Sequence, residues 1–422
     1  MENEKNEKKY TFKNMLTLVI SASALTCVVL CFIFLTIIGA MKNTDSDRGP
    51  GFITPNRGTS DRNAISGEAG EFFDLLEVID ERFIGAFDLS EITDAAMRAA
   101  VESLDDDWSY YMSREEYEEF MANSNNQYRG IGVEVVIDDD TEGMKILGVY
   151  ADSGADRAGI VIGDIITAID GESIIGLSLP EIRIMLRRDI GETARITVLR
   201  ESGVYEDLTV TYDVVYTNPI SFMMLDNNIG YINLRNFEEG SAHKFIDAVN
   251  ELITQGAVSF IYDVRSNPGG RVGEVTGILD FLLPEGEIFI TVDRSGVERI
   301  TESDASFINK PAVVIVNEFS YSGAEFFAAM LCEYNYADTV GTQTTGKNRM
   351  QTTIPLPNGG AVHISTGHYL TKNRVSLFDV GGFTPRYIVE MTDDEMMLFH
   401  RRQLEMEEDP QLLKALSLLT NP

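Results

Sequence analysis

Ser322 lies in a sequence setting that suits a nucleophile. The run VIVNEFSYSGAEFFAAML, residues 314–331, predicts a strand that ends in two serines and a glycine, after which a helix starts at once. Backbone N–H groups and the dipole at a helix start favour a developing oxyanion. The same letters also fit a capping box, in which Ser322 and Glu325 each accept a backbone N–H. Ser322 is therefore either a helix cap or a nucleophile, and a nucleophile needs a base.

Two kinds of base are open to Ser322. A histidine could serve in a Ser–His–Asp arrangement, because such triads are set by geometry and not by spacing. The candidates for that arrangement are His243 or His368 with Asp263. A lysine could serve if burial lowered its pKa into the working range. Lys347 follows Ser322 by 25 residues in a Gly- and Thr-rich loop, and Gln351 could orient it.

Two glycine-bearing loops could bind parts of a substrate. NPGG, residues 267–270, would let the backbone approach a carbonyl and donate N–H groups to it. RGIGV, residues 129–133, would expose consecutive N–H groups in a nest suited to a carboxylate. The plain alternatives are a turn for the first loop and a β-bulge for the second.

Several other chemistries are excluded by the sequence. GTQTTGKN, residues 341–348, nearly spells a phosphate-binding loop, but Asn348 replaces the Ser or Thr that would bind magnesium, and a strand pattern follows. Histidine occurs only at 243, 363, 368 and 400, and no metal-binding Cys or His motif is present. Cys332 is the one cysteine outside the apolar N-terminal segment. We therefore expect no metal site and no cofactor.

The N-terminus and the net charge predict where the protein is located. Between Lys13 and Lys42 lie 28 uncharged residues, enough for a membrane span. Four lysines precede this segment, which favours a cytoplasmic N-terminus and extracytoplasmic catalytic domains on a single-pass protein of the cell membrane. A cleaved signal peptide is the alternative. The net charge of −33 argues against nucleic acid as a partner.

The rest of the chain predicts several domains that mix α+β and α/β structure. Helical apolar spacing comes first, then short β-branched segments between glycines, then strands that alternate with helices as in an α/β core. The predicted segments are a cytoplasmic tail (1–14), a transmembrane helix (15–41), a flexible linker (42–70), a helical region (71–126), a β-rich module (127–214), an α/β core (215–399) and a helical tail (400–422).

Taken together, these motifs resemble those of the C-terminal processing peptidases, also called tail-specific proteases. The shared stretches are DDWSYYM, YRGIGVEV, SGADRAGIVIGDIITAIDG, YDVRSNPGG, VNEFSYSGAE and VGTQTTGKNRMQ. They extend over roughly Ile92 to Met391, and the 25-residue step from serine to lysine matches the family pattern. The resemblance implies a serine endopeptidase with a Ser–Lys dyad, in which Ser322 is the nucleophile, Lys347 the general base and Gln351 the residue that positions the lysine.

The resemblance also implies two binding features. Gly269 or Gly270, together with Gly323, would form the oxyanion hole. The β-rich module would be a PDZ domain that captures the C-terminus of a protein or peptide substrate by strand addition. Its predicted substrate-binding residues are Gly130, Ile131, Gly132, Val133 and Arg187. Self-association into a homo-oligomer is left open.

The sequence departs from the family pattern at four places. SYSGAE replaces S-A-S-A-S-E, and TGKNRMQ replaces F-G-K-G-x-V-Q. Arg188 replaces a glycine in LRRDIG, and Arg386 replaces an aspartate near the end of the core. These changes leave a second interpretation open, in which a catalytically weak or inactive protein binds C-termini as a PDZ scaffold. The expected function is nevertheless a membrane-anchored serine endopeptidase.

Overall fold

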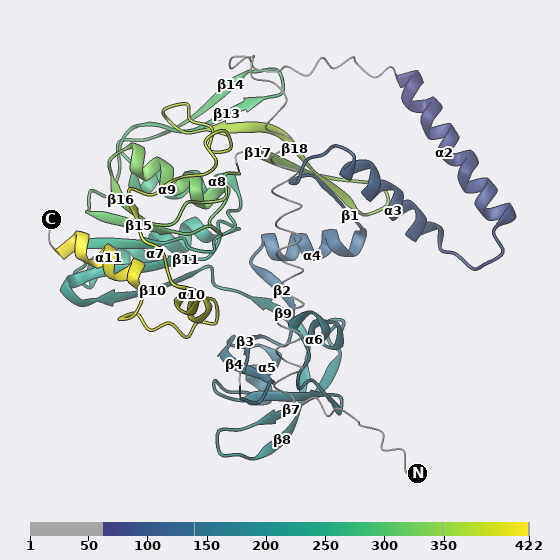
Figure 1. The fold of residues 1–422 in the computed structure, drawn as a ribbon, viewed down its shortest axis with the longest axis horizontal. Helices are drawn as coiled ribbons and strands as arrows, with labels where there is room; N and C mark the ends of the chain where they lie inside the picture. Colours follow the sequence, from purple (N-terminus) through teal and green to yellow (C-terminus); the bar gives the residue numbers. More distant parts are fainter. Residues whose placement is uncertain (1–61, 139, 348, 421–422) are drawn as a thin grey trace, which may run out of the picture. The chain divides into compact units, whose positions relative to one another are not determined.

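The computed structural model describes residues 62–420 except residues 139 and 348 (Figure 1). The chain divides into two compact units, Met1–Phe87 and Asp88–Pro422. The described part of the first unit contains helix α2 (Arg62–Arg82), so the predicted linker 42–70 overlaps a helix even though its glycines and serines favour a loop. The predicted span 15–41 lies outside the described residues. Among the described helices, none has the length and apolar content that a bilayer crossing needs.

The second unit begins with two capped helices, α3 (Leu89–Glu102) and α4 (Arg114–Ser124). The Asp88 carboxylate accepts the Ser90 N–H at 2.7 Å, and Ser113 forms a reciprocal capping box with Glu116. Between the helices lies a short strand, β1 (Tyr110–Met112), which the helical periodicity of this region does not predict. Three residues carry little local signal, and β1 forms because it pairs with a strand about 250 residues further along the chain.

The β-rich module is an antiparallel sheet in the strand order β3-β4-β5-β7-β8, with β6 beside β5. Its apolar side chains alternate along the strands and fill a separate core around Ile146, Ile166 and Ile196. A two-stranded ribbon of β2 (Gln127–Gly130) and β9 (Asp213–Tyr216) lies at its two chain ends. The elements are β3 (Val133–Ile137), β4 (Met144–Val149), α5 (Gly154–Ala158), β5 (Ile165–Ile169), β6 (Glu172–Ser173), α6 (Leu179–Met185), β7 (Thr193–Leu199) and β8 (Tyr205–Thr211).

The core is built on a six-stranded sheet in the order β10-β11-β12-β15-β16-β19. Every pair from β11 to β19 is parallel, and β10 joins the edge antiparallel to β11. β12 and β15 are buried along their whole length, as expected for parallel strands covered on both faces. The strands are β10 (Ile220–Leu225), β11 (Ile229–Leu234), β12 (Ser259–Asp263), β15 (Ala312–Val316), β16 (Ala337–Gly341) and β19 (Tyr387–Ile388), with a 3-10 turn at Asp226–Asn228.

Helices cover both faces of this sheet (Figure 1). Phe260 and Tyr262 of β12 pack on one side with α7 (Ser241–Thr254), α8 (Val272–Leu282) and α9 (Gly323–Glu333). Ile261 points to the other side and packs with α11 (Pro410–Thr420). The helical tail that follows α10 (Asp393–His400) therefore completes the core.

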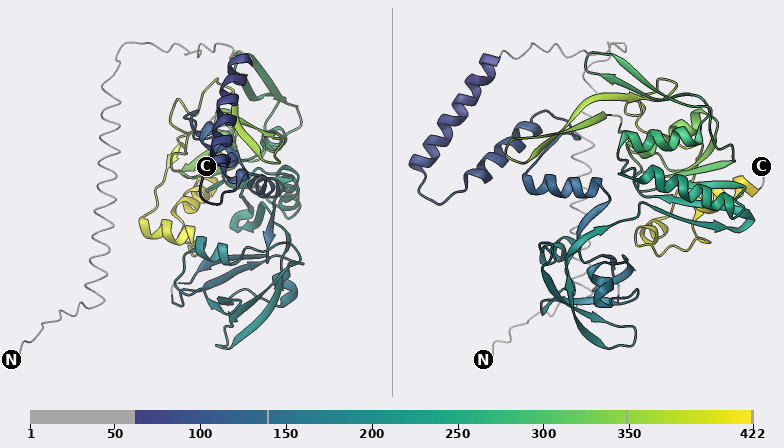
Figure 2. Two further views of the ribbon diagram at one scale, coloured as in Figure 1. Left: turned by 90° about the vertical axis from the view of Figure 1, so that its right-hand side faces the viewer. Right: turned by 180° about the vertical axis from the view of Figure 1, so that it is seen from behind.

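A second, antiparallel sheet carries residues that reach the site. Its order is β1-β18-β13-β14, with β17 also paired to β18, and Figure 2 shows its long strands running from the core toward β1. This sheet was not separated from the α/β core by the sequence pattern, because its strands are distributed among the helices. The strands are β13 (Gly286–Asp293), β14 (Glu298–Ser303), β17 (Arg349–Pro355) and β18 (Ala361–Leu370).

Candidate active site

Ser322 lies at the turn between β15 and α9, at the carboxyl end of a central parallel strand, where ligand sites of α/β sheets form. Its backbone has φ +56° and ψ −119°, a conformation that L residues rarely adopt. Hydrogen bonds to the loop that follows β12 hold this turn in place. Ser320 donates to the Val264 carbonyl at 2.8 Å, and the Asn317 side chain accepts the Ser266 N–H at 2.8 Å. These bonds tie the loop after β15 to the loop after β12 and fix the direction in which Ser322 projects.

The NPGG loop lies directly against Ser322. A Cβ atom on Gly269 would be 2.7 Å from the Gly323 nitrogen and 2.8 Å from the Ser322 Cβ, so only glycine fits there. The Gly269 N–H donates to the Asn267 side chain at 2.8 Å and is therefore occupied. The N–H groups of Gly270 and Gly323 have no acceptor among the described residues. These two are the donors that an oxyanion could use.

Glu325 joins the nucleophile turn to the loop that carries Lys347. Its side chain is fully buried, and one oxygen accepts the N–H groups of Ser322 at 2.9 Å and Lys347 at 2.6 Å. The other oxygen accepts from Thr344 Oγ1 at 2.7 Å and from the Gly346 N–H at 2.8 Å. Burial raises the pKa of Glu325, although these hydrogen bonds oppose the rise. Sequence reasoning identified only its capping role.

The Lys347 amine lies half-buried beside aromatic rings. Its Nζ lies 4.3 Å from the ring centroid of Trp108 and 5.9 Å from that of Tyr321. Burial lowers the pKa of Lys347 from 10.5 to about 8, and the nearby carboxylates of Glu325 and Asp106 limit the fall. In this conformation no hydrogen bond joins Lys347 Nζ to the Ser322 hydroxyl, both of which lie in the described part of the chain. Trp108 lies in DDWSYYM, but nothing in the sequence assigned it to the lysine.

Gln351 lies on β17, and its side chain forms its hydrogen bond with a residue other than Lys347. Its Nε2 donates to Ser365 Oγ on the neighbouring β18 at 3.2 Å, and among the described residues no hydrogen bond joins it to Lys347. Ser109 Oγ accepts the Ser365 N–H at 3.0 Å and donates to Asp106 at 2.5 Å. Gln351 therefore belongs to a polar network that connects DDWSYYM to the lysine-bearing hairpin.

The histidines do not form a triad with Ser322. His243 is exposed and pairs with Asp247 at 3.0 Å, while the Asp263 carboxylate is occupied by Arg265 and Tyr231. In the described residues no hydrogen bond connects any of the four histidines to Ser322. Nδ1 of His363 forms a hydrogen bond with Thr353 Oγ1 at 2.8 Å. Burial, together with the nearby Lys347 charge, lowers the pKa of His363 to about 4. The Ser–His–Asp alternative is not supported by this geometry.

A carboxyl group with an oxygen that accepts no hydrogen bond flanks the NPGG loop. Glu238 follows Phe237, whose carbonyl accepts the Arg271 N–H at 2.7 Å. Glu238 Oε2 is buried without a hydrogen-bond partner, and the Arg271 Nε lies 3.6 Å from it. Burial raises the pKa of Glu238 to about 7, so this group changes charge near neutral pH. No sequence motif singled it out.

A buried arginine fixes the strand end below the NPGG loop. Arg265 bonds Asp263 through Nε at 3.0 Å and Asp409 through Nη1 at 2.7 Å, and all three side chains are nearly inaccessible to solvent. Its guanidinium also lies 4.5 Å from the ring centroid of Phe399. Burial lowers the pKa of Arg265, but the two carboxylates outweigh it and raise the pKa overall. The C-terminal segment is thus attached to the same loop system as the site.

The residues predicted to bind a C-terminus lie in two places. Gly132 has φ +91°, and a Cβ there would be 2.1 Å from the Ser153 Cβ, so the RGIGV turn requires glycine. The Tyr128 hydroxyl reaches this turn and donates to the Val133 carbonyl at 3.5 Å, and burial raises the pKa of Tyr128 to about 12. Arg187 follows α6 and pairs at the surface with Glu115 at 2.7 Å. In the described residues no hydrogen bond or ion pair joins Arg187 to the RGIGV turn.

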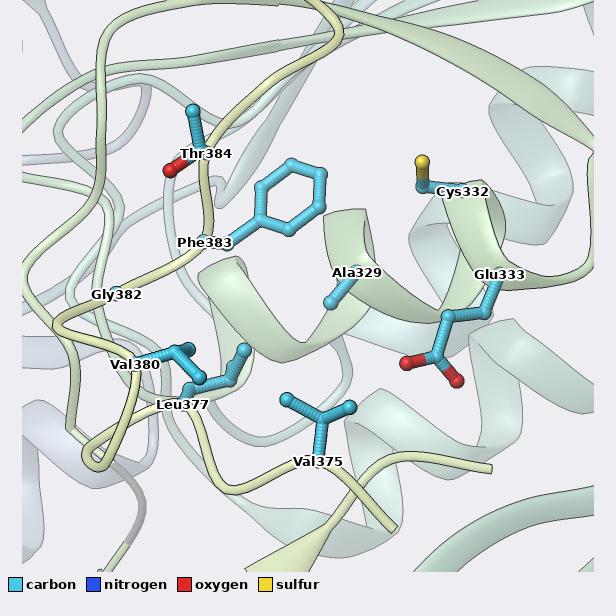
Figure 3. A pocket seen from close by; sticks show the side chains of 9 residues that line it. All are labelled: Ala329, Cys332, Glu333, Val375, Leu377, Val380, Gly382, Phe383 and Thr384. Atoms are coloured by element: carbon cyan, nitrogen blue, oxygen red, sulfur yellow. The ribbon is translucent and has the colours of Figure 1, made fainter. Parts of the chain in front are cut away.

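A cavity of about 200 Å³ lies at the other end of α9 and contains neither Ser322 nor Lys347. Figure 3 shows apolar side chains of the 375–384 loop around α9, together with Cys332 and Glu333. The Glu333 carboxylate already accepts from Thr371 Oγ1 at 2.6 Å and from the Asn373 N–H at 3.0 Å. This cavity is therefore separate from the Ser322 turn and the Lys347 loop. The residues that the structure describes also contain no cluster of three or more His, Cys, Asp or Glu side chains suited to a metal ion.

Comparison with known proteins identifies the β-rich module and the α/β core. Residues 228–389 match the model of peptidase family S41, and residues 145–200 match the model of a PDZ domain. The chain carries an S41 peptidase domain and a PDZ domain. Together with the relatives below, this supports a serine-type peptidase.

Two curated relatives and one solved structure illustrate the similarity. The carboxy-terminal processing protease CtpA of Bacillus subtilis is 28% identical over 76% of this chain and 69% of its own length. The carboxy-terminal-processing protease of Bartonella bacilliformis is 28% identical over 76% of this chain and 75% of its own. A solved structure from Bacteroides fragilis, assigned to the S41 proteases, has a TM-score of 0.53 and 18% identity, covers 80% of this chain and 92% of that one, and supports the fold alone.

Proposed function

We propose that this S41 peptidase is an endopeptidase in which Ser322 is the nucleophile and Lys347 the general base. The observation that carries the proposal is the connection between the two residues. Glu325 binds the backbone of both, while burial lowers the pKa of Lys347 to about 8. A lysine with such a pKa is partly neutral near physiological pH and can accept a proton from a hydroxyl.

The chemistry proceeds in two stages. Ser322 Oγ attacks the carbonyl carbon of the scissile peptide while its proton passes to Lys347 Nζ, and the Gly270 and Gly323 N–H groups stabilise the negative oxygen. The C–N bond then breaks, and the leaving amine takes the proton from Lys347. Water attacks the resulting ester with Lys347 again as base, which releases the acid and restores Ser322. Gly269 does not donate to the oxyanion; its lack of a side chain lets the NPGG loop approach Ser322 closely.

The conformation described above is a resting one under this proposal. Lys347 Nζ lies over the Trp108 ring and has no hydrogen bond to the Ser322 hydroxyl, so the amine is not aligned for reaction. The backbone of Lys347 is held by Glu325, and we propose that its side chain turns from Trp108 toward Ser322 for reaction. We assign Gln351 to the network that holds the lysine hairpin.

The remaining parts of the proposal concern recognition and location. The RGIGV turn of the PDZ domain would bind the terminal carboxylate of a protein substrate, with the peptide added as a strand. Residues 15–41 would anchor the chain in the cell membrane with the peptidase on the extracytoplasmic side. A binding test with a peptide and its C-terminally amidated form addresses recognition, since loss of the carboxylate should abolish binding.

A second function has one observation in its favour. Because Lys347 is stacked on Trp108 and not bonded to Ser322, the same geometry suits an inactive scaffold that binds C-termini. The test is incubation of the full-length chain with an unfolded protein such as casein, beside Ser322→Ala and Lys347→Ala. Cleavage by the parent that both folded variants lose supports the dyad. Binding of C-terminal peptides by all three without any cleavage supports the scaffold, and cleavage that survives Lys347→Ala excludes this lysine as the base.

A further inference from the structure

Tyr369 lies at the junction of the nucleophile and the base, although no motif pointed to it. It belongs to β18 and is only 5% exposed. Its ring packs against Phe289 of β13 and Phe326 of α9, with centroid separations of 5.5 Å and 5.4 Å. The side chain is therefore fixed by packing from two elements, which also holds its hydroxyl in place.

The Tyr369 hydroxyl donates a hydrogen bond to the Lys347 carbonyl. Burial raises the pKa of Tyr369, and an interaction with the Ser322 side chain, which favours the phenolate, partly offsets that rise. The Glu325 carboxylate is also near enough to add to that rise. One hydroxyl thus contacts the base residue and lies beside the nucleophile.

The main chain of Lys347 is consequently held at both of its polar groups. Its N–H donates to Glu325 of α9 at 2.6 Å, and its carbonyl accepts from Tyr369 of β18. The two partners come from different elements and are both buried, so the backbone of Lys347 cannot shift without breaking a buried hydrogen bond. Only the side chain, which now lies on Trp108, is left to move.

We propose that Tyr369 is a positioning residue of the peptidase, which fixes the backbone of Lys347 beside Ser322 so that the amine reaches the nucleophile when it leaves Trp108. This inference rests on the proposed Ser–Lys function. The hydroxyl does not exchange a proton with the substrate. It holds the base in place, and without it the backbone of Lys347 is free on one side, where the amine gains access to water.

The test compares Tyr369→Phe with Tyr334→Phe in the full-length chain. Tyr334 is a matched control because its hydroxyl also donates to a main-chain carbonyl, that of Glu287 at 3.1 Å, and because it also contacts β13. Both substitutions keep the ring and leave one carbonyl without its donor. Melting temperatures therefore show the loss of stability that either change causes, apart from any effect on the site.

Two readouts separate positioning from stability. The first is kcat and KM with a peptide substrate as a function of pH. The second is the titration of Lys347 itself, followed by NMR on 13C-methylated lysines and assigned by the signal that Lys347→Arg removes. Tyr369→Phe is expected to lower kcat by about 10- to 100-fold with little change in KM. It should also move the Lys347 titration and the acid limb of the kcat profile to higher pH, while Tyr334→Phe matches the parent.

Equal Lys347 titration curves for the parent and Tyr369→Phe would overturn the inference, and so would a kcat for Tyr369→Phe equal to that of Tyr334→Phe. The proposed function fails in a different way: either the parent cleaves no substrate, or its cleavage survives Ser322→Ala. The NMR titration needs no turnover, so it decides the role of Tyr369 in that case as well.

Discussion

Replacing Lys347 by methionine should remove peptidase activity and yet stabilise the fold at neutral pH. Burial lowers the pKa of Lys347 from 10.5 to about 8, which means that the folded chain disfavours the ammonium. For a shift of about 2.5 pH units at about 1.4 kcal/mol per unit, this is at most about 3.5 kcal/mol. The side chain is only partly buried, so solvent screening reduces the figure to about 2 kcal/mol. The variant also loses the stabilising contact between the Lys347 ammonium and the Trp108 ring, which costs about 1 kcal/mol of stability.

The net gain for Lys347→Met is therefore about 1 kcal/mol at pH 7, and it should depend on pH in a defined way. Between pH 8 and 10.5 the unfolded chain binds the proton more tightly than the folded chain, so the parent gains stability as pH rises through this window. The advantage of the methionine variant should accordingly shrink above pH 8.

The assay is urea unfolding of the parent and the variant at pH 7 and at pH 10. Lys372→Met is the control, because Lys372 Nζ also lies over an aromatic ring, 3.8 Å from the Tyr334 centroid, but away from Ser322. It should lose stability slightly at both pH values. A Lys347→Met variant that is less stable than the parent at pH 7, or a difference that does not change with pH, would refute the assignment of a destabilised ammonium.

Three further substitutions test the buried groups around the site. Glu325→Gln should destabilise the chain by about 3 kcal/mol and abolish cleavage, because a neutral amide cannot accept all four donors, and urea unfolding measures the loss. Arg265→Met should cost about 3–5 kcal/mol since it leaves Asp263 and Asp409 buried without their cation, and faster amide exchange in the C-terminal helix should accompany it. Glu238 has a pKa raised from 4.5 to about 7, so the free energy of unfolding of the parent should fall as pH rises from 4.5 to 7. The fall is at most about 3.5 kcal/mol, or about 2 kcal/mol after solvent screening. Glu238→Gln should remove this slope in melting temperature, and an unchanged slope would contradict the raised pKa.

Local sequence patterns were sufficient to predict those parts of the site whose residues lie close together in the chain. The β15–α9 turn places Ser322 where the strand and helix patterns indicated, and the NPGG loop follows the neighbouring strand as expected for parallel strands. The S41 and PDZ matches confirm the resemblance that these motifs carried. The roles of Ser322 and Lys347 stay predictions until they are tested.

Contacts between distant segments could not be predicted in this way. Trp108 and Tyr369 reach Lys347 through the second sheet, which has no local signal because its strands pair across large sequence separations. Arg265 meets Asp409 across 144 residues for the same reason. Gln351 fits the family spacing, but the backbone places its amide against Ser365, a detail that depends on strand register and not on residue order.

The most direct test of the account is covalent labelling of the full-length chain with a fluorophosphonate, followed by mass spectrometry of the modified peptide. The account predicts an adduct on Ser322 that forms faster as pH rises through about 8 and that is nearly absent in Lys347→Met. Labelling of another serine, or labelling of Ser322 at an undiminished rate in Lys347→Met, would contradict the assignment of nucleophile and base.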